Sequence, residues 1–171
     1  MRRAAIFGGS FSPFHEGHRN LVREVLRRGL ADEVWIMPCR RNPLKDGSTT
    51  WDDRTRLEML RREAREIDPE RVRVSDMELG MPEPSYTCDT ARRLMAEHPD
   101  VRFRLLVGAD SYLRFEEWRD WRWLEEQLSP IVYPRPGYGI EHLREGWTLL
   151  DDAPQTDISS TRIRNEMKTK S

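Results

Sequence analysis

Short apolar runs alternate with segments of helical periodicity along this chain. The runs are bounded by turn residues and cover residues 4–7, 34–37, 72–74, 103–107 and 131–133. Runs this short are typical of buried strands. Between them, apolar residues recur at helical spacing within residues 21–26, 57–67 and 91–95, which predicts amphipathic helices. The alternation predicts an α/β fold with a doubly wound, mostly parallel sheet that binds ligands outside the carboxyl ends of its strands.

Length and composition narrow the class of protein. A chain of 171 residues can bury its own core, so we expect a single domain over residues 1–171. The formal charge is −1, with arginines and carboxylates intermixed, so no nucleic-acid surface is expected. The two cysteines lack zinc-site or disulfide spacing, and the sequence has neither a signal peptide pattern nor an apolar stretch of ~20 residues. We therefore expect a cytoplasmic protein with no membrane partner.

The segment after the first predicted strand has the composition of an anion site. Residues 8–18 read GGSFSPFHEGH and lead into the first predicted helix. Gly8 and Gly9 allow a sharp turn that presents backbone N–H groups, and a helix N-terminus adds further donors. His15 and His18 are three residues apart, so both rings can reach one spot and hold phosphate oxygens. The alternatives are two unrelated surface histidines at a helix start and a metal site, which is the weaker one because the other histidines lie in distant stretches of the sequence.

Several motifs together resemble one known family. Residues 8–18 resemble the amino-terminal phosphate motif of the nucleotidyltransferase superfamily, and residues 158–164, ISSTRIR, resemble its carboxy-terminal partner. Residues 85–90, 108–111 and 135–138 resemble segments of the pyridine-nucleotide branch. On these motifs, the chain resembles the nicotinate-nucleotide adenylyltransferases. The resemblance implies a Rossmann-like sheet of the nucleotidyltransferase type. It also implies transfer of the adenylyl group of ATP to nicotinate mononucleotide, which gives deamido-NAD and pyrophosphate in NAD biosynthesis.

The resemblance carries catalytic roles over to His15, His18, Lys45 and Arg164. In the family, the two histidines contact the ATP phosphates and stabilise charge on the pentacoordinate phosphorus, without a covalent intermediate. Lys45 matches a lysine near the reacting phosphates, although Leu44 stands where the family often has histidine. Arg164 would add charge to the leaving pyrophosphate. A surface lysine and a solvated arginine on a capped terminal helix are the plain alternatives. Mg²⁺ is implied as a cofactor held mainly by the ATP phosphates.

The same resemblance implies the binding residues. Those for ATP are Gly8, Gly9, Ser10, Phe11, Gly108, Asp110, Ile158, Ser159, Ser160 and Thr161. Those for the mononucleotide are Thr87, which would help hold the nicotinate carboxylate, and Trp118, which would stack on the pyridine ring. Thr87 and Asp110 have helix capping as their alternative role, and Trp118 has simple packing. Arg135 could meet either the acceptor side or the adenine side.

Other functions remain open at this stage. The acceptor could be nicotinamide mononucleotide or another phosphorylated compound, and the chain could be a nucleotide sensor without turnover. A dehydrogenase is disfavoured, since the turn lacks the G-x-G-x-x-G spacing. A homo-oligomer is possible, with surface tryptophans such as Trp147 as a weak hint.

Overall fold

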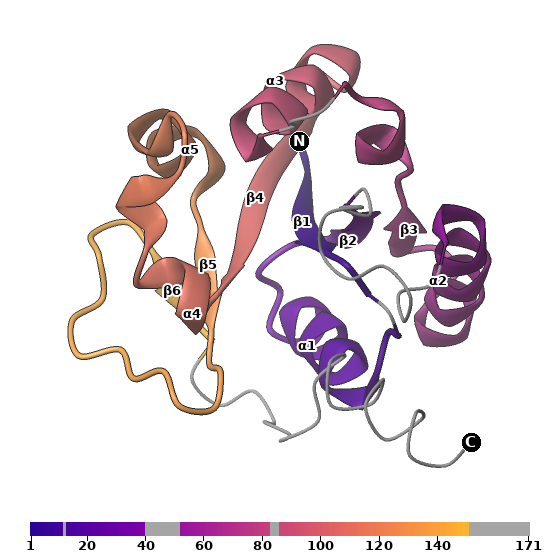
Figure 1. Ribbon diagram of the computed structural model, residues 1–171, viewed down its shortest axis with the longest axis horizontal. Coiled ribbons are helices and arrows are strands. Elements are labelled where there is room, and N and C mark those ends of the chain that lie inside the picture. The colour runs from indigo at the N-terminus through magenta and orange to yellow at the C-terminus, as the bar shows by residue number, and fades with distance from the viewer. Residues whose placement is uncertain (12, 40–51, 83–85, 151–171) are drawn as a thin grey trace.

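The computed structural model describes residues 1–11, 13–39, 52–82 and 86–150. Its centre is a six-stranded sheet with parallel pairings in the order β3-β2-β1-β4-β5-β6 (Figure 1). The strands are β1 (Arg2–Gly9), β2 (Glu33–Pro38), β3 (Val72–Val74), β4 (Val101–Gly108), β5 (Ile131–Tyr133) and β6 (Thr148–Leu149). This is the strand order of the Rossmann-like fold, so the expected doubly wound α/β fold is confirmed.

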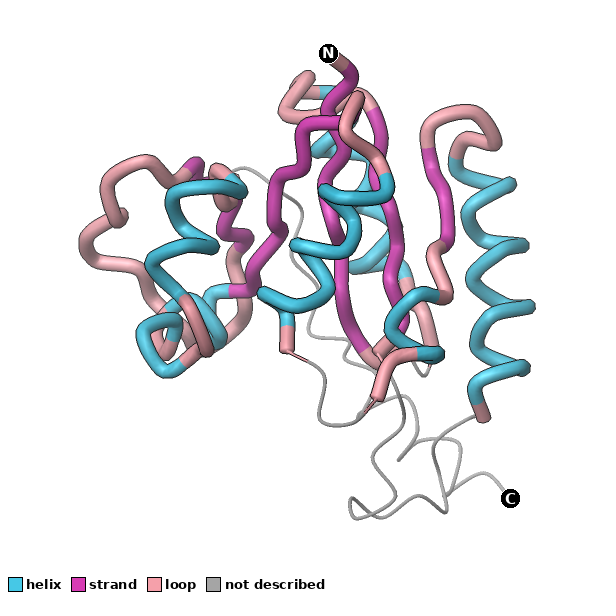
Figure 2. The backbone as a smooth tube through the Cα atoms, turned by 90° about the horizontal axis from the view of Figure 1, so that it is seen from above, coloured by secondary structure: helices cyan, strands magenta, loops and turns pink. Residues whose placement is uncertain are grey.

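Helices cover both faces of the sheet (Figures 1 and 2). On one face lie α1 (Glu16–Arg27) and α2 (Asp53–Ile67). On the other face lie α3 (Thr87–Glu97), α4 (Ala109–Tyr112) and α5 (Trp121–Leu128), together with the 3-10 helices η2 (Met77–Gly80) and η3 (Phe115–Glu117). Among the described residues, no helix is long and apolar enough to cross a membrane.

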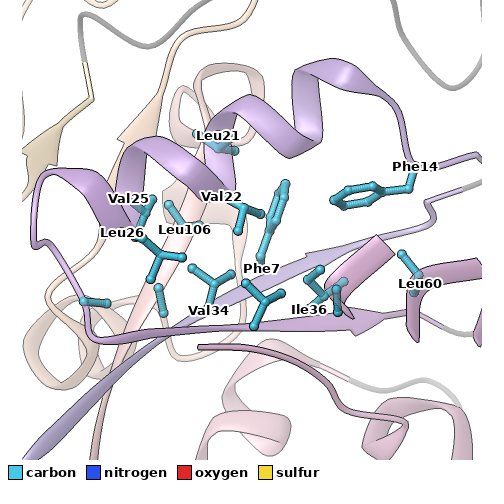
Figure 3. Packing of buried hydrophobic residues seen from close by; sticks show 14 of the residues in the cluster. Phe7, Phe14, Leu21, Val22, Val25, Leu26, Val34, Ile36, Leu60 and Leu106 are labelled. Atoms are coloured by element: carbon cyan, nitrogen blue, oxygen red, sulfur yellow. The ribbon is translucent and has the colours of Figure 1, made fainter. Parts of the chain in front are cut away.

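The apolar stripe of α1 explains why this helix packs on the sheet. Val22 and Val25 are fully buried and Leu26 is nearly so. Figure 3 shows the three side chains directed toward the sheet, where Val34 of β2 lies beneath them. Every residue of β2 is buried, because a central parallel strand has helices on both sides. Packing on the two faces therefore fixes where the carboxyl ends of β1 and β2 lie.

Arg104 of β4 ties three segments together near the amino ends of the strands. Its guanidinium donates to the carbonyl oxygens of Ser129 and Leu30 at 2.9 and 3.1 Å, and to Oγ1 of Thr148 at 2.9 Å. Ser129 precedes β5, Leu30 precedes β2, and Thr148 begins β6. Arg104 is thus a structural clamp at the end of the sheet opposite the strands' carboxyl ends.

The strands and helices predicted within the described residues are all present. The short elements β6, α5, η2 and η3 were not predicted, and α4 was expected only through the capping alternative for Asp110. The expectation that Trp147 lies at the surface is wrong. Its side chain is 6% exposed, and its Nε1 donates to Glu125 at 2.8 Å. A homo-oligomer stays a prediction, now without this support. Residues 38–50, 80–85 and 151–156 are rich in Pro, Gly, Asp and Ser, which predicts loops, and the first and last of these segments lie almost entirely outside the described residues.

Candidate active site

Two strands that end in glycine meet where the strand order reverses. β1 and β4 are neighbours, with β2 and β3 beyond β1 and with β5 and β6 beyond β4. The crevice at such a reversal is the usual ligand site of an open α/β sheet. β1 ends in Gly8 and Gly9, and β4 ends in Gly108. A Cβ atom on Gly108 would lie 2.7 Å from Oδ1 of Asp110, so glycine is needed for this close approach of the carboxylate to the strand end.

Phe11 gives the glycine turn, residues 8–11, its shape. Its φ is +48°, a left-handed conformation that costs a non-glycine residue on the order of 1–3 kcal/mol. The ring is buried against Phe7 and Phe14, with ring centroids 5.1 and 5.6 Å apart. It lies 3.1 Å from the position of a Cβ on Gly9, which explains the glycine there. Because Phe11 is 2% exposed, its ring belongs to the core and offers no stacking surface to a ligand.

A hydrogen bond and ring stacking connect the two histidines of the first motif. His15 is the N-cap of α1, and its Nδ1 accepts a hydrogen bond from Gly17 N–H at 3.1 Å. The His15 N–H donates in turn to Nδ1 of His18 at 3.0 Å. The two rings are stacked with centroids 3.8 Å apart. Since each Nδ1 is an acceptor, the proton of each neutral ring must be on Nε2. Each ring therefore offers one Nε2–H donor to a ligand.

Both rings are neutral at pH 7. Burial, followed in order of effect by the neighbouring His15, Arg135 and Arg19, lowers the pKa of His18 from 6.5 to about 2. Burial, followed by the charges of Arg135 and Arg19, lowers the pKa of His15 from 6.5 to about 4. The stacked Phe14 ring, 5.0 Å from His18 between centroids, forms part of this apolar surrounding. The pair can thus donate hydrogen bonds to an anion without carrying charge of its own.

Arg135 belongs to the same end of the sheet. Its charge lowers the pKa of both histidines. It also bonds the side chain of Tyr133 and opposes the burial that raises the Tyr133 pKa to about 12. The sequence left open which side of the site Arg135 would meet, and in the structure it lies near enough for its charge, like that of Arg19, to act on both histidines. Arg135 was missing from the sequence-based list of catalytic residues.

A cavity of about 180 Å³ connects the glycine turn to the other face of the sheet. Gly8 and Gly9 line one side of it, and Thr87 and Trp118 line another. Residues expected to bind two different substrates therefore share one cavity. Sequence reasoning missed its other polar walls, which are Cys39 after β2, Glu78 of η2 and Thr90 of α3.

The structure also bears on the alternative roles of these residues. Tyr86, and not Thr87, is the N-cap of α3, and no side chain caps that helix. Gly108 is the N-cap of α4, so Asp110 does not take that position either. Trp118 both packs and lines the cavity, because its half-buried ring lies 5.0 Å from that of Phe115 between centroids.

Part of the predicted site lies outside the described residues: Lys45, Ile158, Ser159, Ser160, Thr161 and Arg164. Within the described part of the chain, no group of three or more His, Cys, Asp or Glu side chains is placed to hold a metal ion. The described residues thus contribute donors, a cation and a cavity, and no metal cage.

Comparisons with known proteins show the family and the fold. The profile of the cytidylyltransferase-like family matches residues 6–166. A probable nicotinate-nucleotide adenylyltransferase of Bacteroides fragilis is 37% identical over 98% of the chain and 83% of the relative. A solved Plasmodium falciparum nicotinic acid mononucleotide adenylyltransferase, complexed with NaAD, has a TM-score of 0.75 at 18% identity, over 96% of this chain and 83% of that one. A bifunctional NMN adenylyltransferase/ADP ribose pyrophosphatase of Francisella tularensis, complexed with AMP and a manganese ion, has a TM-score of 0.53 at 18% identity, over 99% and 42%.

Proposed function

Since the chain belongs to the nicotinate-nucleotide adenylyltransferases of the cytidylyltransferase-like family, we propose that it joins nicotinate mononucleotide to the adenylyl group of ATP. The products are deamido-NAD and pyrophosphate. The observation that carries the proposal is the cavity at the strand reversal, where the glycine turn faces Thr87 and Trp118. ATP phosphates at the turn, and the phosphate of a mononucleotide whose pyridine ring lies beside Trp118, would then be held close together for the reaction.

The reaction is a direct displacement at phosphorus. An oxygen of the mononucleotide phosphate bonds to the α-phosphorus of ATP, and the bond from that phosphorus to the pyrophosphate oxygen breaks. The Nε2–H groups of His15 and His18 donate to the phosphate oxygens on which charge develops. Arg135 supplies positive charge to the same region. Lys45, Arg164 and residues 158–161 would bind the departing pyrophosphate, as the family resemblance implies.

A divalent metal ion fits this site as a companion of the substrate. Mg²⁺ prefers oxygen ligands and often binds through substrate phosphates and water. The ion would neutralise charge on the ATP phosphates, and the protein groups above would orient those phosphates.

The surroundings of Thr87 favour an acidic acceptor. The cavity lies at the start of α3, where no side chain caps the helix and the backbone donors carry partial positive charge. Arg119, which follows Trp118, places its guanidinium carbon 4.8 Å from the ring centre of Tyr86. Both features favour a nicotinate carboxylate over a nicotinamide amide, and Glu78 in the cavity wall opposes them. We therefore expect kcat/KM to be higher for nicotinate mononucleotide than for nicotinamide mononucleotide.

The test is pyrophosphate release by the purified protein with ATP and Mg²⁺, comparing nicotinate and nicotinamide mononucleotides at matched concentrations. We expect a clear preference for the nicotinate form. Equal rates would shift the proposal to a less selective adenylyltransferase, and release with neither would point to a nucleotide sensor or another acceptor.

Two substitutions at His18 separate its two nitrogens. In His18→Gln the amide nitrogen can take the place of Nε2, whereas in His18→Asn the amide oxygen takes the place of Nδ1 and no donor faces the phosphates. We expect His18→Asn to lower kcat about 100-fold or more, as the loss of one transition-state donor does in other enzymes, and His18→Gln to retain more activity. The reverse order would assign His18 a role in the backbone of the turn alone.

A further inference from the structure

Arg56 is a fully buried cation next to the glycine turn. It lies on α2, its side chain is 2% exposed, and one guanidinium nitrogen donates to the Ser10 carbonyl oxygen at 2.8 Å. Another guanidinium nitrogen donates to Oδ1 of Asp53 at 2.6 Å. Arg56 also reaches Cys39, where burial raises the thiol pKa and the charge and hydrogen bond of Arg56 act against that rise. One side chain thus joins the ends of β1 and β2 to the start of α2.

This arrangement is expensive for a purely structural contact. Its Nε atom is buried and has no hydrogen-bond partner among the described residues, and buried unsatisfied donors and buried charges both oppose folding. Asp53, the carboxylate that pairs with it, is 43% exposed in its side chain. An apolar residue of similar volume would fill the same space at lower cost. The contact between the guanidinium and the Ser10 carbonyl oxygen therefore serves the conformation of the glycine turn and not packing alone.

The contact with Ser10 also sets the orientation of the peptide bond between Ser10 and Phe11. A trans peptide is planar, so the C=O of residue 10 and the N–H of residue 11 point in opposite directions. With the Ser10 oxygen held by Arg56, the Phe11 N–H must point away from α2's guanidinium. Within the described residues, this N–H has no backbone acceptor. Phe11 also has the strained φ of +48°, so the turn needs such outside contacts to keep one conformation.

We propose that Arg56 is a positioning residue of the glycine turn, which fixes the Ser10–Phe11 peptide so that the Phe11 N–H remains available to an anionic phosphate. The inference rests on the proposed function for the identity of that anion, the phosphates of ATP. Arg56 itself does not touch the substrate. Without it, the peptide can rotate and present a carbonyl oxygen, which repels phosphate, in place of a donor.

Arg104→Gln provides a matched control for Arg56→Gln. Both arginines donate to backbone carbonyl oxygens, but Arg104 does so at the amino ends of the strands. Both variants should lower the unfolding temperature. Only Arg56→Gln should raise the KM for ATP, by about tenfold, and lower kcat, with the KM for the mononucleotide changed less than threefold. Arg56→Lys keeps the charge and one donor, and we expect it to recover part of the ATP affinity.

A second measurement reports on the peptide without turnover. The chain has five phenylalanines, so labelling them with ¹⁵N gives a simple amide spectrum in which Phe11→Leu identifies one signal. Addition of ATP and Mg²⁺ should shift the Phe11 amide signal downfield in the wild type and in Arg104→Gln. The shift should be lost or strongly reduced in Arg56→Gln.

The outcomes separate this proposal from the proposed function. A folded Arg56→Gln protein with wild-type KM for ATP and a wild-type Phe11 shift would overturn the role of Arg56. If Arg56→Gln does not fold, Asp53→Ala decides, because it removes one anchor of the guanidinium at a half-exposed position. We expect it to raise the KM for ATP several-fold, and no change would overturn the proposal. If no mononucleotide supports pyrophosphate release but the ATP-induced shift still depends on Arg56, the proposed function fails and the positioning role stands.

Discussion

Replacement of His18 by glutamine should change how the stability of the protein depends on pH. The folded protein keeps His18 neutral, with its pKa lowered from 6.5 to about 2 by burial and by nearby charges. The unfolded chain, in contrast, takes up a proton on this ring as the pH falls through 6.5. Because the unfolded state then binds more protons than the native state, His18 makes the protein less stable as the pH falls below about 6.5.

The size of the effect follows from the same two pKa values. Between pH 7 and pH 5 the unfolded ring goes from mostly neutral to almost fully protonated, whereas the folded ring stays neutral. One proton per pH unit corresponds to about 1.4 kcal/mol, and integration over this interval gives about 2 kcal/mol for His18. His15 shifts in the same direction, but it is half-exposed and is present in both proteins, so its contribution largely cancels.

The assay is urea unfolding followed by tryptophan fluorescence at pH 7, 6 and 5. From pH 7 to pH 5, the wild type should lose about 2 kcal/mol more unfolding free energy than His18→Gln. His142→Gln, at an exposed position on the connection between β5 and β6, should follow the wild-type curve. Parallel curves for the wild type and His18→Gln would refute the reasoning. They would mean that the native protein protonates His18 as readily as the unfolded chain does, and that His18 is not a neutral donor at the turn.

Three further substitutions test the rest of the site. Trp118→Ala should raise the KM for the mononucleotide at least tenfold and the KM for ATP little. Trp123 lies outside the cavity wall, so Trp123→Ala should change neither KM. Equal effects of Trp118→Ala on both substrates would assign Trp118 to packing alone. Arg119→Gln should lower several-fold the ratio of kcat/KM for nicotinate mononucleotide to kcat/KM for nicotinamide mononucleotide. Arg122→Gln removes a similar contact over Trp121 and should leave this ratio unchanged. Gly108→Ala should weaken ATP binding about tenfold in calorimetry, since its Cβ would lie 2.7 Å from a carboxylate oxygen; unaltered binding would exclude this strand end from the nucleotide site.

The parts of the molecule that depend on local patterns were predictable from the sequence. Strand β1, the glycine turn and helix α1 follow from an apolar run, paired glycines and a 3.6-residue stripe, all within residues 4–26. Thr87 and Trp118 were assigned through family motifs, and they line one cavity in the structure. Their roles toward a substrate stay predictions until the kinetics are measured.

The parts that depend on distant contacts were not predictable. Helical spacing places Arg56 on the same face of α2 as Leu60 and Ala64, but its contact with Ser10, 46 residues away in the sequence, does not follow from that spacing. The neutral state of His18 depends on burial beneath Phe7, Phe11 and Phe14, whose rings meet only after the turn has formed. Local periodicity therefore predicted which elements form, whereas the charge state and the orientation of the site arise from tertiary packing.

The identity of the transferred group is tested most directly with ATP radiolabelled at the α-phosphorus, incubated with the protein, Mg²⁺ and nicotinate mononucleotide. We predict that the label appears in a dinucleotide with the mass of deamido-NAD, and that ATP labelled at the γ-phosphorus gives labelled pyrophosphate in equal amount. Label that remains in ATP, or that appears in ADP or free AMP, would contradict adenylyl transfer to the mononucleotide.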